Sequence, residues 1–200
     1  KIKAKVIIST GMSTLDEIKD TVNLYSNKKN IALLHCVSNY PCSLNSLNLN
    51  NIKILRNKFN VQVGFSDHSI GNQASIISVG YGASIIEKHF TLSKSLNGPD
   101  HLASSTPKEF NSLVIDLKRS TKMLGSYERK IQNEEKIMRR ISRKSIIFNK
   151  NLLKGHKLRE SDITLIRPGT GLSGDKIQFF LNKKLKRKVK KYSQITFKDV

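Results

Sequence analysis

The sequence lacks any long apolar run, and no stretch approaches the ~18 consecutive apolar residues of a membrane-spanning helix. Its start leads directly into Val6, Ile7 and Ile8, without the extended apolar segment and cleavage site of a secretory signal. Cysteine is scarce, because Cys36 and Cys42 are the only two, and they provide no disulfide framework. These absences predict a protein of a reducing, cytoplasmic compartment with no membrane partner.

Acidic residues are few as well. The chain has 36 Lys and Arg against 15 Asp and Glu, which gives a formal net charge of +21, and basic residues become denser at 139–144 and 183–191. This charge raises the alternative of a non-catalytic, nucleic-acid-binding module. Aromatic residues make up only 6%, however, and do not alternate with the basic runs as stacking platforms would. A solvated basic surface is the simpler interpretation, and nucleic acid is not the expected partner.

Apolar runs and amphipathic segments alternate through residues 1–125. Strands are expected at 5–9, 31–37, 61–65 and 83–89, and helices at 13–26, 47–59, 72–81 and 107–124. Near-continuous apolar strands are typical of parallel strands buried on both faces, so the pattern predicts an α/β fold. Eight βα units close a TIM barrel, so these four form either a small open sheet or half of a (β/α)8 barrel. The start directly before a strand favours the half barrel.

The last of these helices has a clear start signal. Thr106 is expected to cap it, Pro107 suits its first turn, and Glu109 follows closely. The three residues therefore predict a helix that begins at Pro107.

The composition changes after residue 125. Residues 126–142 are polar and are expected to form a partly helical linker. Beyond them, short strands are expected at 143–148, 163–167 and 195–197, separated by turns that contain Gly and Pro. The pattern predicts a small β-rich domain at 143–200.

Two of the expected strands end near a histidine, His68 after the third and His89 at the end of the fourth. Active-site residues of a barrel come from the carboxyl ends of its strands. Since adjacent strands lie ~4.8 Å apart, two inward-directed imidazoles can share a catalytic metal ion. Glu87 lies on the same strand face as His89, whereas Asp67 points away from His68. Histidines held by hydrogen bonds in the core or at the surface are the alternative interpretation.

Seven segments, taken in order, resemble the sialic acid synthase family, which includes the legionaminic and pseudaminic acid synthases. They are IISTGMSTLDEI, LLHCVSNYP, VGFSDHSIG, GASIIEKHFTL, GPDHLASSTPKEF, KGHKL and IRPGTG. The SDH, EKHF, GPDH and RPGTG blocks in this order make the resemblance specific. It implies a (β/α)8 barrel followed by a small antifreeze-like (SAF) domain, of which this chain holds barrel strands five to eight and the SAF domain.

The resemblance implies an activity and a set of catalytic residues. The family condenses phosphoenolpyruvate with N-acetylmannosamine or a related N-acylated amino sugar and releases phosphate, for the synthesis of nonulosonic acids and cell-surface polysaccharide. His68 and His89 match the ligands of a divalent metal, Mn²⁺ or Mg²⁺, that polarises the sugar aldehyde. Glu87 and Asp100 match positions that contact the sugar and water on the metal, so all four are the implied catalytic residues.

Four further positions match substrate-binding residues of the family: Tyr40, Ser66, Ser38 and Arg167. Some relatives have asparagine where this sequence has Ser38. Arg167 matches an arginine that reaches across a dimer to the N-acyl group of the sugar, which implies a domain-swapped homodimer.

The sequence also departs from the family pattern. The lysines that hold phosphoenolpyruvate and two catalytic glutamates belong to barrel strands one to four, which this sequence does not contain. We therefore expect the chain to be inactive alone. One piece of a split synthase remains an alternative.

Overall fold

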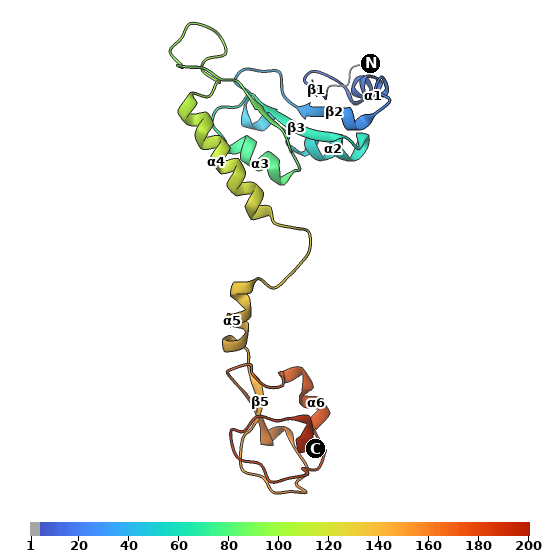
Figure 1. Cartoon of the computed structure of the whole chain (residues 1–200), viewed down its shortest axis with the longest axis vertical. Helices are drawn as coiled ribbons and strands as arrows, with labels where there is room; N and C mark the ends of the chain where they lie inside the picture. The colour runs from blue at the N-terminus through green and yellow to red at the C-terminus, as the bar shows by residue number, and fades with distance from the viewer. Residues whose placement is uncertain (1–4) are drawn as a thin grey trace. The chain divides into compact units, whose positions relative to one another are not determined.

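The computed structural model describes residues 5–200. The chain divides into two compact units, the first ending at Ser126 and the second beginning at Tyr127. They run from blue to green and from yellow to red in Figure 1. Each unit buries an apolar cluster of its own.

The first unit is built on one parallel sheet. Its strands lie in chain order, β1 (Val6–Ser9), β2 (Ile31–His35), β3 (Gln62–Asp67) and β4 (Ile86–Lys88). Every neighbouring pair is parallel. A doubly wound sheet reverses its strand order at a switch point, whereas a barrel does not, so the first unit is an α/β fold with a half-barrel sheet.

Helices cover one face of this sheet. They are α1 (Leu15–Asn23), α2 (Asn50–Phe59), α3 (Gln73–Gly80) and α4 (Pro107–Leu124), with 3₁₀ turns at Lys28–Asn30 and Leu44–Ser46. The core joins alternate residues of the central strands, such as Ile31 and Phe65, to apolar residues of the helices, such as Val22 and Ile52. Burial of both faces of β2 explains its continuous apolar sequence.

Capping residues fix where α4 begins. The backbone N–H of Thr106 donates to Glu109 Oε2 at 2.9 Å, and the Thr106 hydroxyl accepts from the Glu109 N–H. This reciprocal pair satisfies two donors that the helix leaves open, and Pro107 needs no partner at the first position. The predicted start at Pro107 is confirmed.

The fourth strand is shorter than predicted. β4 spans Ile86–Lys88, although Ser84 and Ile85 already form backbone hydrogen bonds with β3. His89 lies just beyond the strand, and its carbonyl accepts from the Ser105 N–H at 2.7 Å.

The second unit has less regular structure than predicted. It contains α5 (Asn133–Ser142), β5 (Ser145–Phe148), β6 (Ile163–Ile166) and α6 (Ile177–Phe180), with 3₁₀ turns at Glu160–Asp162, Gly174–Lys176 and Phe197–Asp199. β5 and β6 pair antiparallel, and isolated bridges join other segments. Its core is formed by buried apolar residues, among them Ile146, Phe148, Leu158, Phe180 and Ile195.

The prediction of a strand at 195–197 is wrong, because no strand forms there. Ile195 donates its N–H to the Ile146 carbonyl as a strand residue would. Phe197 begins a 3₁₀ turn instead, because Asp199 Oδ2 accepts from both the backbone N–H and the hydroxyl of Thr196. A local side-chain cap therefore ends the extended backbone one residue early.

Across residues 5–200, the helices are too short or too polar to cross a bilayer.

Candidate functional site

A polar cluster forms where β3 and β4 end. Strand pairing sets Ser66 directly beside Glu87. The Ser66 hydroxyl donates to Glu87 Oε1 at 2.7 Å, and its oxygen lies 3.2 Å from His68 Nε2. Ser66 and His68 are buried, whereas Glu87 is exposed. The predicted residues from two separate strands therefore meet at one end of the sheet.

The surroundings of His68 fix the state of its ring. Nδ1 lies 2.7 Å from the Val37 carbonyl, which can only accept, so Nδ1 carries the proton. In the neutral ring, Nε2 is then left with a free electron pair. Ser66 has one proton and donates it to Glu87, so that electron pair remains available. A second nitrogen held by a backbone carbonyl is the usual arrangement of a metal-binding histidine.

His89 lies next to His68 and has its own acidic neighbour. The two ring centroids are 5.3 Å apart, with the rings nearly perpendicular. His89 Nδ1 lies 3.8 Å from Asp100 Oδ2, and both side chains are partly exposed. Two imidazoles that share one ion through bonds of about 2.1 Å have centroids roughly 5 Å apart. The spacing of the two rings is therefore compatible with one shared ion.

The described residues offer this ion only part of a coordination shell. Within residues 5–200, no group of three or more His, Cys, Asp or Glu is placed to hold a metal. A pair of histidines by itself would leave several positions on an ion open, which is what a catalytic metal requires.

Tyr40 lies against both histidines. Its ring centroid is 4.2 Å from that of His68 and 5.1 Å from that of His89. Burial raises the pKa of Tyr40, and the charges of Cys36, Asp100 and Glu87 raise it further. Tyr40 therefore keeps its proton at neutral pH and can act as a donor.

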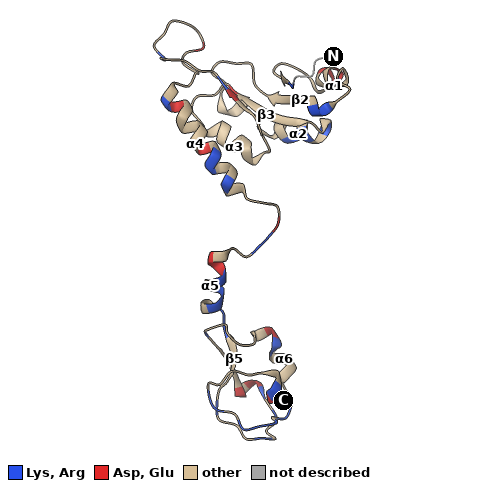
Figure 2. Ribbon diagram, viewed as in Figure 1, with Lys and Arg blue, Asp and Glu red and all other residues tan. Residues whose placement is uncertain are grey.

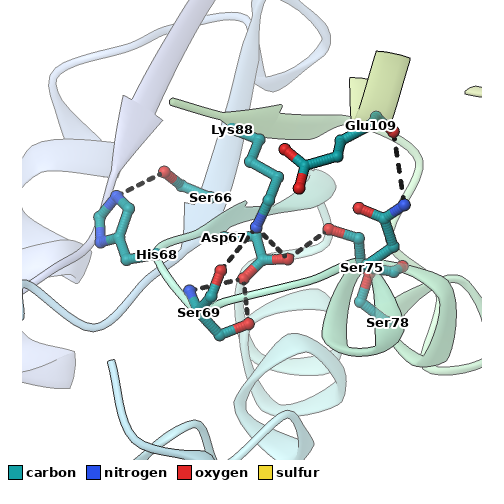
Figure 3. Close-up of polar contacts among 9 residues, drawn as sticks. Ser66, Asp67, His68, Ser69, Ser75, Ser78, Lys88 and Glu109 are labelled. Carbon is teal, nitrogen blue, oxygen red and sulfur yellow. Dashed lines mark hydrogen bonds and ion pairs between the residues drawn. The ribbon is translucent and has the colours of Figure 1, made fainter. Parts of the chain in front are cut away.

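A buried ion pair lies behind the cluster, on the helix-covered face of the sheet (Figure 3). Lys88 Nζ is 3.1 Å from Asp67 Oδ2, and the two side chains are 2% and 0% exposed. Asp67 also accepts from the Ser69 N–H and from the hydroxyls of Ser69 and Ser75. Lys88 donates to the Ser69 carbonyl at 2.7 Å. The pair is fully supported by hydrogen bonds, as a buried ion pair must be.

Sequence reasoning placed Asp67 on the opposite face from His68, as the structure has it, but missed Lys88. The available signal was strand alternation, because Lys88 stands between Glu87 and His89 and must point to the helix layer.

Two further predicted site residues line hollows of their own. Ser38 lines a cavity of about 410 Å³ with Thr10, Cys36 and residues of α1 and α2. Arg167 belongs to the second unit, where it lines a hollow of about 320 Å³ with Tyr192 and Gln194. The cluster itself comprises Tyr40, Ser66, His68, Glu87, His89 and Asp100.

The first unit is thus a barrel-type α/β fold with a polar site at its strand ends. A family model described as the NeuB family matches residues 1–129. The chain belongs to the NeuB family.

Individual proteins of similar sequence are named as synthases of this kind. The N,N'-diacetyllegionaminic acid synthase of Legionella pneumophila is 42% identical over 189 residues, which is 92% of this chain and 53% of the relative. The chain spans about half the length of the curated relatives it matches.

Solved structures agree with the fold. An N-acetylneuraminic acid synthetase from Leptospira borgpetersenii, crystallised with citrate, has a TM-score of 0.63 and 38% identity, and the match covers 67% of this chain and 47% of that one. A spore coat polysaccharide biosynthesis protein from Bacillus subtilis has a TM-score of 0.57 and 27% identity, over 98% of this chain and 60% of that one.

Proposed function

We propose that the protein functions in a sialic-acid-type synthase, which condenses phosphoenolpyruvate with an N-acylated amino sugar in nonulosonic acid biosynthesis. The observation that carries the proposal is the cluster of Ser66, His68, Glu87 and His89 at the carboxyl ends of paired strands, in a chain of the NeuB family. N-acetylmannosamine and its di-N-acylated deoxy relatives are the candidate sugars.

His68 and His89 would hold a divalent metal, Mn²⁺ or Mg²⁺. When bound, the ion supplies Lewis-acid polarisation of the sugar aldehyde. The Val37 carbonyl holds the neutral His68 ring in the tautomer that presents the electron pair of Nε2. Ser66 and Glu87 stand next to this nitrogen and can orient the sugar.

The overall reaction balances in bonds and protons. The C=C electron pair of phosphoenolpyruvate forms a bond from its methylene carbon to the aldehyde carbon, and the aldehyde C=O becomes a hydroxyl. Water adds its oxygen to the enol carbon, and the bond from that carbon to the phosphate oxygen breaks to leave a keto group. Of the two protons of the water, one goes to the aldehyde oxygen and the other leaves with the phosphate. Glu87 and Asp100 are the acid–base candidates for these proton transfers, and the Tyr40 hydroxyl is a candidate sugar contact.

The two units take separate roles in this proposal. Residues 1–125 would supply strands five to eight of the barrel, 126–142 a linker, and 143–200 an antifreeze-like SAF domain. The SAF domain would bring Arg167 to the N-acyl group of the sugar bound by a partner subunit. The functional form is then a domain-swapped homodimer.

A phosphate-release assay on the full-length gene product tests the proposal. We expect phosphate release that requires phosphoenolpyruvate, an N-acylated amino sugar and a divalent metal together. The 200-residue chain alone should release none, because the phosphoenolpyruvate-binding lysines of the family have no counterpart in it. A full-length product that binds metal but consumes neither substrate would contradict the proposal.

A further inference from the structure

The second unit contains a hollow of about 290 Å³ with a strongly basic lining. Five of its eight lining residues are cationic, and none is acidic or aromatic: Lys136, Arg139, Arg140, Arg143, Lys144, Gly169, Gly171 and Ser173. Its lining shares no residue with the polar cluster of the first unit or with the hollow that Arg167 lines. Figure 2 shows blue ribbon, which marks Lys and Arg, in the C-terminal part of α5 and just beyond it.

The cationic side chains come from one short stretch of chain. Lys136, Arg139, Arg140 and Arg143 follow the spacing i, i+3, i+4, i+7, which places them along one side of α5 and its C-cap. Lys136 and Arg140 are like charges at i, i+4, an arrangement that destabilises a helix without a compensating anion. Attraction to the helix dipole accounts for Arg139 and Arg140 in the last turn but not for the whole stripe.

The opposite wall is a loop held close to the helix end. The Gly169 N–H donates to the Arg140 carbonyl at 2.8 Å, and a Cβ at Gly169 would lie 2.6 Å from Arg143 Cβ. Ser145 fixes the same loop, because its hydroxyl donates to the Pro168 carbonyl and accepts from the Gly171 N–H. Close approach of this loop therefore requires glycine and gives the basic stripe a facing wall.

The five cations have no acidic partner in the described chain. Among residues 5–200, the ion pairs of the second unit engage Lys130, Lys150, His156, Lys176 and Arg187, but none of the residues that line the hollow. Three arginines present planar forks that match phosphate oxygens in a bidentate manner. The lining offers no aromatic face for a nucleobase, so charge and phosphate geometry would determine recognition.

We propose that this hollow binds a compact small molecule that carries two or more phosphate groups. Pyrophosphate is the simplest probe, and calorimetric titration of the protein at low salt measures its affinity. The test variant is Arg139→Gln with Arg143→Gln, which keeps the Cβ that packs against Gly169. The matched control is Lys188→Gln with Lys190→Gln, which removes the same charge from the same unit outside the lining.

The expected result is saturable binding that weakens at least about tenfold in the test variant and changes within about twofold in the control. Orthophosphate should bind more weakly than pyrophosphate. Circular dichroism checks folding, and Lys136→Gln with Arg140→Gln repeats the test if the first variant unfolds. Undetectable binding of pyrophosphate would overturn the proposal. An equal loss of affinity in the test variant and in the Lys188 and Lys190 control would overturn it as well. A short single-stranded oligonucleotide that displaces pyrophosphate more effectively than tripolyphosphate would also overturn it, because nucleic acid would then be the ligand.

Discussion

Asp67 and Lys88 occupy directly paired positions of β3 and β4, and their side chains form an ion pair that is almost fully buried. The residues next to the pair in sequence, Ser66 and His68 at the end of β3 and Glu87 and His89 at the end of β4, meet in the polar cluster. The pair thus fixes the register on which the geometry of the site depends.

Removing one partner of this pair should be costly. Lys88→Met leaves the Asp67 carboxylate buried without its cation and should lower the free energy of unfolding by about 3–5 kcal/mol. The double variant Asp67→Asn with Lys88→Met should recover part of that loss. Urea denaturation followed by circular dichroism measures both.

The matched control is Lys94→Met, which breaks a partly exposed ion pair with Glu109 at 2.7 Å, whose side chains are 35% and 45% exposed. The loss of stability should stay below about 1 kcal/mol, because solvent screens this pair far more than the buried one. A Lys88 variant no less stable than the Lys94 variant would show that the buried pair does not hold the strands.

Gly64 should not tolerate a side chain. A Cβ there would overlap the Ile85 carbonyl and Leu34 Cδ2, so Gly64→Ala should cost about 1–3 kcal/mol or more. Gly80 has open space at the same position, and Gly80→Ala should be neutral or stabilising by up to about 1 kcal/mol. Thermal melts of the two alanine variants compare them directly, and equal melting temperatures would contradict the packing described for Gly64.

Acid should destabilise the second unit through Asp162. Burial raises the pKa of this carboxyl, but Lys150, His156 and the Arg159 N–H outweigh burial and lower it from 3.8 to about 2. Because the folded-state pKa is depressed, the stabilisation is complete above pH ~4 and disappears as pH falls toward 2, a change of about 2 kcal/mol.

Asp162→Asn should reduce the dependence of the free energy of unfolding on pH between about 4 and 2. Denaturant unfolding at successive pH values measures this dependence. Asp175→Asn serves as the control, because the Asp175 side chain is exposed. An unchanged slope in the Asp162 variant would contradict the assignment.

Ser66 should matter for substrate more than for folding. Ser66→Ala removes the donor to Glu87 Oε1 but keeps a small buried side chain, so stability should change little. In the full-length gene product, the KM for the amino sugar should rise by about tenfold, the size of one hydrogen bond to a charged group. An unchanged KM would show that Ser66 does not contact the substrate. The control is Ser69→Ala, because the Ser69 hydroxyl donates to Asp67 on the helix-covered face, and this variant should leave the KM for the amino sugar unchanged.

Elements with strong local signals were predictable, and those set by long-range pairing were not. The start of α4 followed from Thr106, Pro107 and Glu109, because capping depends on neighbours in the chain. The Asp67–Lys88 pair depends on the register between two strands, which a single sequence does not contain. The predicted strand at 195–197 failed because the cap formed by Asp199 competes locally with extended backbone.

The site shows the same division. Strand ends and alternation predicted that His68, Glu87 and His89 would share a face, and they do. The contact of Val37 with His68, which selects the ring tautomer, comes from a residue 31 positions away and left no signal in the sequence.

The most direct test of the account is a Mn²⁺ titration of the full-length gene product, followed by electron paramagnetic resonance of the free ion. The account predicts one saturable site per chain that is lost in His68→Ala and in His89→Ala and retained in His156→Asn, a histidine of the second unit. Undiminished Mn²⁺ binding in both alanine variants, with folding intact, would contradict the assignment of the two histidines as metal ligands.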